Sequence, residues 1–130
     1  MKIYLVDDND KFRKGLKLFL EKYHEYEIVG EDGDGESLLL SNWQYADIIL
    51  MDINMPNTNG IQASKFCKGT CRRIKVIAIS QFKDEISVKQ LVCAGFSGFV
   101  NKNDIFEELA AAIEKVYAGG YYFPSYLHTE

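Results

Sequence analysis

Acidic side chains follow two separate apolar runs of this chain. Asp7 and Asp8 come directly after the run 2–6, and Asp52 comes where the run 47–51 stops. Short, nearly all-apolar runs are typical of strands buried on both faces, and the carboxyl ends of parallel strands meet at one edge of a sheet. We therefore expect the three carboxylates to converge. Taken alone, Asp52 also fits a solvated loop, so the interpretation depends on the ends of the other strands.

Two more polar residues stand at the ends of later apolar runs. Ser80 closes the run 74–79, and Lys102 follows the run 98–100. Clustered carboxylates repel one another, and a hard divalent cation such as Mg²⁺ relieves this repulsion because it prefers oxygen ligands. Adding an ammonium and a hydroxyl gives a site suited to a phosphoryl group during transfer. Because Asp52 ends the central run, we predict that it is the nucleophile and forms an acyl phosphate.

Strand-like and helix-like segments alternate five times along the 130 residues. The predicted strands are 2–6, 27–31, 47–51, 74–79 and 98–100. The predicted helices follow residues that favour helix N-termini, namely Asn9, Asp34 or Gly35, Asn59, Asp84 and Asp104. The segment 121–130 shows no periodicity. This alternation predicts an α/β fold with a parallel sheet covered by helices on both faces.

Composition limits the classes of function. The net charge of −4 argues against nucleic-acid binding through a broad basic face. The three cysteines are an odd count, which favours free thiols in a reducing compartment. Cys67 and Cys71 are four residues apart, but no nearby His or Cys completes a metal site. The chain enters a strand directly after Met1 and has no apolar run approaching 18 residues, so we expect a cytoplasmic protein without a signal peptide or membrane span.

The sequence resembles the receiver domain of two-component response regulators. The resemblance rests on the Asp pair after the first strand, the pattern Asp52-x-x-Met55-Pro56-x-x-x-Gly60, and the strand-end Ser80 and Lys102. It implies a CheY-like, flavodoxin-like fold, a doubly wound five-stranded parallel sheet with strand order 2-1-3-4-5 and five helices. It covers about residues 2–120, so we expect a receiver domain over 1–120 and a C-terminal tail, or the start of a linker to an absent output domain, over 121–130.

The resemblance also implies roles for the site residues. Asp52 would take a phosphoryl group from a sensor histidine kinase in the presence of Mg²⁺. Asp8 and Asp52 would contact the metal directly, Asp7 would assist, and the backbone carbonyl of Asn54 would be a further ligand. Lys102 would pair with the phosphoryl oxygens. The chain would have no enzymatic activity beyond its own phosphorylation and autodephosphorylation.

Further residues match family positions that change conformation on phosphorylation or control access of water to the phosphoryl group. Ser80 and Phe99 match the coupled pair that reports phosphorylation. Asn54, Gln81 and Phe82 match positions that tune the approach of water to the phosphorus. Gln81 departs from the small residue usual in this family, and we expect it to block both water and phosphoryl donors.

The end of the chain resembles one branch of the family. Residues 112–123, with Ala118-Gly119-Gly120 within them, are similar to the end of receivers joined to a LuxR-type helix-turn-helix. This implies control of transcription through a DNA-binding domain outside these 130 residues, with homodimerisation on phosphorylation as one option. One alternative is a stand-alone receiver that acts through protein contacts. Another is an aspartyl-phosphate phosphatase, but such enzymes need a second acid where Asn54 stands.

Overall fold

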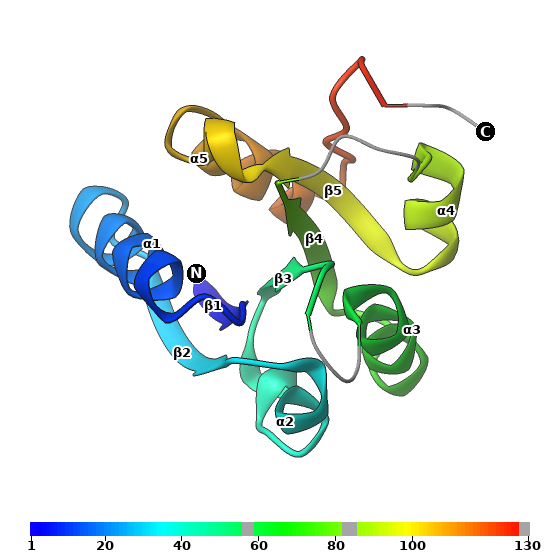
Figure 1. Ribbon diagram of the computed structural model, residues 1–130, viewed down its shortest axis with the longest axis horizontal. Coiled ribbons are helices and arrows are strands. Elements are labelled where there is room, and N and C mark those ends of the chain that lie inside the picture. The colour runs from blue at the N-terminus through cyan, green and yellow to red at the C-terminus, as the bar shows by residue number, and fades with distance from the viewer. Residues whose placement is uncertain (56–58, 82–85, 128–130) are drawn as a thin grey trace.

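The computed structural model describes residues 1–55, 59–81 and 86–127. Its sheet has five parallel strands in the order β2-β1-β3-β4-β5, as predicted (Figure 1). The strands are β1 (Lys2–Val6), β2 (Glu27–Asp32), β3 (Ile48–Asp52), β4 (Lys75–Ser80) and β5 (Phe96–Asn101). Because all strands run in one direction, their carboxyl ends lie along one edge of the sheet.

Within the described residues, one α-helix follows each strand, which confirms the predicted alternation; the first four helices connect consecutive strands, and the fifth follows the last strand. The helices are α1 (Asp10–Tyr23), α2 (Gly35–Leu39), α3 (Gly60–Thr70), α4 (Val88–Cys93) and α5 (Ile105–Tyr117). Figure 1 shows α1 and α5 on one face of the sheet and the other three on the opposite face. Within the described residues, no helix is long and apolar enough to cross a bilayer.

Each face of the sheet has its own apolar core. The core under α1 and α5 includes Leu5, Leu50, Ile79, Leu109 and Ile113. The core on the other face includes Trp43, Met51, Ala78, Leu91 and Phe99. Every residue of β3 is buried, because helices cover both sides of that strand. Burial of each large apolar side chain contributes about 1.5–3 kcal/mol, so the central strands are held firmly and give the site a rigid base.

Helix starts follow the expected capping chemistry at three positions. The side chains of Asn9, Asp34 and Asn59 each accept a hydrogen bond from the backbone N–H three residues later. Such a cap contributes about 1 kcal/mol, because it satisfies a donor that the helix leaves unpaired. Asp104 precedes α5 as predicted, but its side chain makes no capping hydrogen bond.

The fourth helix begins later than the sequence pattern predicts. Its cap is Ser87, so the prediction of Asp84 was wrong; Asp84 itself lies outside the described residues. Ser87 Oγ accepts a hydrogen bond from the Gln90 backbone N–H at 3.1 Å, and Gln90 Oε1 accepts one from the Ser87 N–H at 2.8 Å. This reciprocal arrangement satisfies two donors at once and therefore fixes the helix start.

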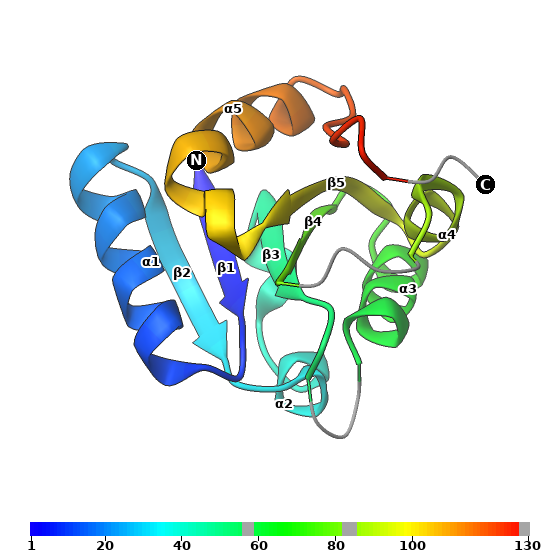
Figure 2. The ribbon, with the colours of Figure 1, turned by 45° about the horizontal axis from the view of Figure 1, so that its top comes forward.

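The segment after α5 returns to the sheet, which its sequence does not predict. Tyr122 N–H donates to the Ser97 carbonyl at 3.0 Å, and Phe99 N–H donates to the Tyr122 carbonyl at 2.8 Å. Leu127 is only 6% exposed and joins the core that contains Phe99. Figure 2 shows this segment passing beside β5. Part of the outer edge of β5 is therefore paired with the chain itself.

Candidate functional site

The acidic side chains converge at the carboxyl edge of the sheet. Asp7 directly follows β1, and Asp52 is the last residue of β3. One oxygen from each of Asp7, Asp8 and Asp52 lies within 4.8 Å of the others. Asp7 and Asp52 are each only 3% exposed, whereas Asp8 is exposed. The strand ends thus bring together three negative charges, two of them poorly hydrated.

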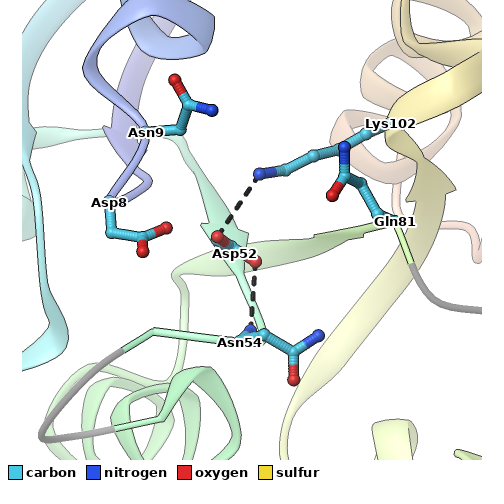
Figure 3. Close-up of a pocket in the computed structure, with 6 residues that line it drawn as sticks. All are labelled: Asp8, Asn9, Asp52, Asn54, Gln81 and Lys102. Atoms are coloured by element: carbon cyan, nitrogen blue, oxygen red, sulfur yellow. Dashed lines mark hydrogen bonds and ion pairs between the residues drawn. The ribbon is translucent and has the colours of Figure 1, made fainter.

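Lys102 supplies the positive charge of this cluster. Its Nζ lies 2.7 Å from Asp7 Oδ2 and 3.4 Å from Asp52 Oδ2, and its side chain is 10% exposed. Figure 3 shows the lysine side chain extending from its own strand end toward Asp52. One ammonium among three carboxylates leaves an excess of negative charge, so the site retains an attraction for a further cation.

The protonation of Asp52 reflects this imbalance. Burial and, after it, the nearby Asp7 carboxylate raise its pKa from 3.8 to about 7, against the opposing effects of Lys102 and the Asn54 N–H. Asp7 Oδ2 is buried and accepts no well-aligned hydrogen bond from the described residues, although Lys102 Nζ is near. Lys102 alone therefore compensates only part of the negative charge of the three carboxylates.

The donor set fits a hard divalent cation. It consists of carboxylate oxygens at the mouth of a pocket, with no cysteine or histidine in the cluster. Mg²⁺ prefers such oxygen ligands and retains water or phosphate oxygens in its remaining positions. The exposed Asp8 leaves one side of the cluster open to solvent, so Asp7, Asp8 and Asp52 fit a cation that keeps part of its hydration shell.

Asp52 is held in place by the turn that follows it. The Asn54 N–H donates to Asp52 Oδ1 at 3.0 Å, and the Gly60 N–H donates to the Ile53 carbonyl at 3.0 Å. A Cβ at position 60 would lie 2.4 Å from the Asp52 carbonyl oxygen and 2.8 Å from the Ile53 Cα. Neither backbone atom can move freely, so this close approach requires glycine.

A pocket of about 240 Å³ opens over this cluster. It is lined by Asp8, Asn9, Asp52, Asn54, Gln81 and Lys102 (Figure 3). Two of the predicted access-tuning residues, Asn54 and Gln81, thus lie at the pocket. The third, Phe82, lies outside the described residues.

The two predicted switch residues occupy neighbouring strands. Ser80 ends β4 and is 3% exposed, and its Oγ accepts a hydrogen bond from Asn54 Nδ2 at 3.3 Å. Phe99 lies on β5 with a fully buried side chain, and pairs in register with Ala78 rather than lining the pocket. The site and Phe99 are therefore linked through β4 and not by direct contact with the acidic cluster.

Two residues at the start of α1 belong to the site, although the sequence pattern assigns them only to the helix. Asn9 lines the pocket, and its N–H donates to Asp7 Oδ1 at 2.8 Å. The ring centroid of Phe12 lies 4.6 Å from Lys102 Nζ. Their place in the sequence could have predicted this role. A helix that starts directly after an acidic strand end must place its first turn beside those acidic side chains.

Comparison with known proteins identifies the family. The model of the response regulator receiver domain matches residues 3–114 of this chain. The transcriptional regulatory protein DegU of Brevibacillus brevis is 35% identical over 123 residues, which cover 94% of this chain and 52% of that protein. The response regulator GacA of Pseudomonas aeruginosa is 31% identical over 123 residues, covering 94% of this chain and 58% of that protein. The chain thus spans little more than half the length of these curated relatives.

Solved structures agree with this assignment. The isolated REC domain of RcsB from Salmonella enterica serovar Typhimurium, solved with the phosphomimetic BeF₃⁻, superimposes with a TM-score of 0.84 at 21% identity, covering 97% of this chain and 94% of that chain. A LuxR-family two-component response regulator from Aurantimonas gives a TM-score of 0.81 at 28% identity, covering 93% of this chain and 87% of that chain. This chain belongs to the family of response regulator receiver domains.

Proposed function

We propose that Asp52 is the phosphoacceptor of this receiver and that a sensor histidine kinase is the donor. The observation that supports this most strongly is the buried Asp52 carboxylate, which faces the pocket with Lys102 Nζ 3.4 Å from one of its oxygens. A carboxylate at the end of a rigid strand is fixed for attack, and the ammonium is placed to meet the charge of an incoming phosphoryl group.

The transfer requires one bond to form and one to break. An Asp52 carboxylate oxygen attacks the phosphorus of the kinase phosphohistidine, the P–N bond breaks, and its electron pair stays with the imidazole. Asp7, Asp8, Asp52 and the backbone carbonyl of Asn54 would hold Mg²⁺, which would neutralise charge on the phosphoryl oxygens. Lys102 moves from its carboxylate partners to a phosphoryl oxygen. The reaction is self-modification of the receiver rather than turnover of a substrate.

Phosphorylation would then change the balance between two conformations. The Ser80 hydroxyl, which accepts the 3.3 Å hydrogen bond from Asn54, would donate instead to a phosphoryl oxygen. Phe99 is fully buried on β5, next to β4, which ends at Ser80. The packing of the Phe99 ring therefore depends on the position of the end of β4. Such a switch needs a contact that differs between the two states, and the bond from Ser80 to the phosphoryl group provides it. The affected surface is formed by α4, β5 and α5.

The output is proposed from the relatives. DegU of Brevibacillus brevis and LnrK of Bacillus subtilis are transcriptional regulatory proteins, and each is longer than this chain. We therefore expect the phosphorylated receiver to act in the cytoplasm on transcription, through a DNA-binding domain outside residues 1–130 and with homodimerisation as one route. Residues 1–120 would form the receiver unit and 121–130 a C-terminal tail or the start of a linker, whose Tyr122 pairs with β5 before the chain leaves the receiver.

Mass spectrometry after incubation with phosphoramidate and Mg²⁺ tests the phosphoacceptor. We expect one phosphoryl group, removed by hydroxylamine because acyl phosphates are cleaved by it, and absent from Asp52→Asn. Asp47→Asn is the matched control, since Asp47 stands at the opposite end of the same strand and accepts a hydrogen bond from the Lys2 N–H at 2.8 Å. Phosphorylation of Asp52→Asn at the wild-type rate would overturn the assignment.

A further inference from the structure

We propose that Phe12 is a positioning residue for Lys102 and holds its ammonium at the site by a cation–π contact. The inference rests on the proposed phosphorylation of Asp52. Lys102 Nζ lies 4.6 Å from the centroid of the Phe12 ring, well inside the distance of about 6 Å at which a cation is attracted to an aromatic face. The lysine side chain is 10% exposed, so little water competes with this contact.

Among the described residues, two carboxylates and the Phe12 ring lie close to the ammonium, and the ring differs from the other two in carrying no charge. Asp7 Oδ2 lies 2.7 Å and Asp52 Oδ2 lies 3.4 Å from Nζ. A third carboxylate in place of the ring would hold the lysine too, but it would add negative charge beside an incoming phosphoryl group. A phenyl face attracts the ammonium without that repulsion, because its attraction comes from a quadrupole and not from a net charge.

The ring itself is fixed by the start of α1. The Phe12 N–H donates to the Asn9 side chain at 3.0 Å, and the Phe12 side chain packs against the core under α1 and α5. The opposite partner is fixed as well, because Asn101 Oδ1 accepts a hydrogen bond from the Asn103 N–H at 2.9 Å in the turn that begins at Lys102. Two capped turns therefore set the distance between ring and lysine.

The ring matters most when the carboxylates are engaged elsewhere. A cation bound to Asp7 competes with Lys102 for the same carboxylate, whereas the contact with the Phe12 ring is left unchanged. Lysine has many rotamers and loses much entropy when it is ordered. A partner that persists throughout metal binding and phosphoryl transfer keeps the ammonium within reach of Asp52. The Lys102 side chain then loses less conformational entropy on reaching the transition state.

The rate of Asp52 phosphorylation by phosphoramidate and Mg²⁺ tests this proposal. Phe12→Leu preserves an apolar side chain of similar size but removes the aromatic face, and we expect phosphorylation to slow by about three- to tenfold. Phe12→Tyr keeps the face and should react at close to the wild-type rate. Phe19→Leu is the matched control on the same helix, because its ring contacts Phe106 rather than the lysine, and its rate should equal that of the wild type.

The same comparison in the Lys102→Met background separates positioning from packing. If Phe12 acts through the ammonium, the double variant Lys102→Met/Phe12→Leu should be phosphorylated at the same rate as the single variant Lys102→Met. Fluorinated phenylalanines at position 12 give a second series, in which the rate should fall as fluorine weakens the ring face while size changes little. An equal loss in both backgrounds, or a rate that does not follow fluorination, would overturn the proposal. A wild-type chain that acquires no phosphoryl group would instead overturn the proposed function.

Discussion

The free energy of unfolding should depend on pH through Asp52 in the metal-free protein. Burial and the Asp7 charge raise the pKa of Asp52 to about 7, above its ordinary value of 3.8. The folded state therefore binds this proton more tightly than the unfolded state does. The contribution of Asp52 to stability is complete below about pH 4, is lost as the pH rises toward 7, and is constant above that. A shift of about 3 pKa units corresponds to about 4 kcal/mol in total.

Replacement of Asp52 by Asn isolates this contribution, because Asn keeps the shape and removes the charge. The difference in unfolding free energy between Asp52→Asn and wild type should grow in favour of the variant by about 2–3 kcal/mol between pH 5 and pH 8. Urea unfolding at several pH values in EDTA measures this difference, and subtraction removes the titration of all groups that the two proteins share.

Millimolar Mg²⁺ should reduce that difference at pH 8. A ligand that binds only the folded state stabilises it by mass action, and the wild type has one more carboxylate for the metal than the variant. A difference that stays flat with pH in EDTA would refute the raised pKa of Asp52. Equal stabilisation of both proteins by Mg²⁺ would show that the cation does not use this carboxylate.

Three further predictions concern the turn, the pocket and the tail. Gly60→Ala should cost at least about 2 kcal/mol in urea unfolding, because the new Cβ would lie 2.4 Å from a backbone oxygen of β3; Gly69→Ala in the same helix meets nothing within 4 Å and should not destabilise. Gln81→Ala should speed both phosphorylation and autodephosphorylation a few-fold, and slower autodephosphorylation alone would contradict the steric interpretation. Removal of residues 121–130 should cost about 2 kcal/mol in thermal or urea unfolding, since it exposes the site of Leu127 and breaks two backbone hydrogen bonds; an unchanged stability would show that the tail adds nothing.

The sheet and the acidic cluster could be predicted because both depend on local patterns. Apolar runs mark the buried strands, and the cap residues Asn9, Asp34 and Asn59 mark helix starts through bonds that span three residues. Once the strands are parallel, the positions of Asp7 and Asp52 at strand ends place them at one edge. To predict the cluster, the strand order was needed as well, and the alternation of strands and helices constrained that order strongly.

The remaining features depend on contacts between distant residues. Asp84 and Ser87 are both good N-cap residues. The helix begins after Ser87, because Ser87 and Gln90 form a reciprocal pair of hydrogen bonds, and residue type alone does not favour Ser87 over Asp84. The pairing of Tyr122 with β5 adds a segment without periodicity to a strand more than twenty residues away. A non-periodic segment gives no pattern from which its partner could be inferred.

The surroundings of Lys102 show where prediction from sequence stops. The sequence places the backbone of this residue at a strand end, but the four-carbon side chain can reach many partners, and its rotamer decides which of them it meets. In the structure the ammonium lies between Asp7 and Asp52 and over the Phe12 ring. The two carboxylates lie at the strand ends where charge was expected, whereas the ring comes from the helix that follows Asn9, for which the sequence predicts no role in the site. A polar site is therefore completed in part by apolar residues, and these are recognisable only when the side chains are placed.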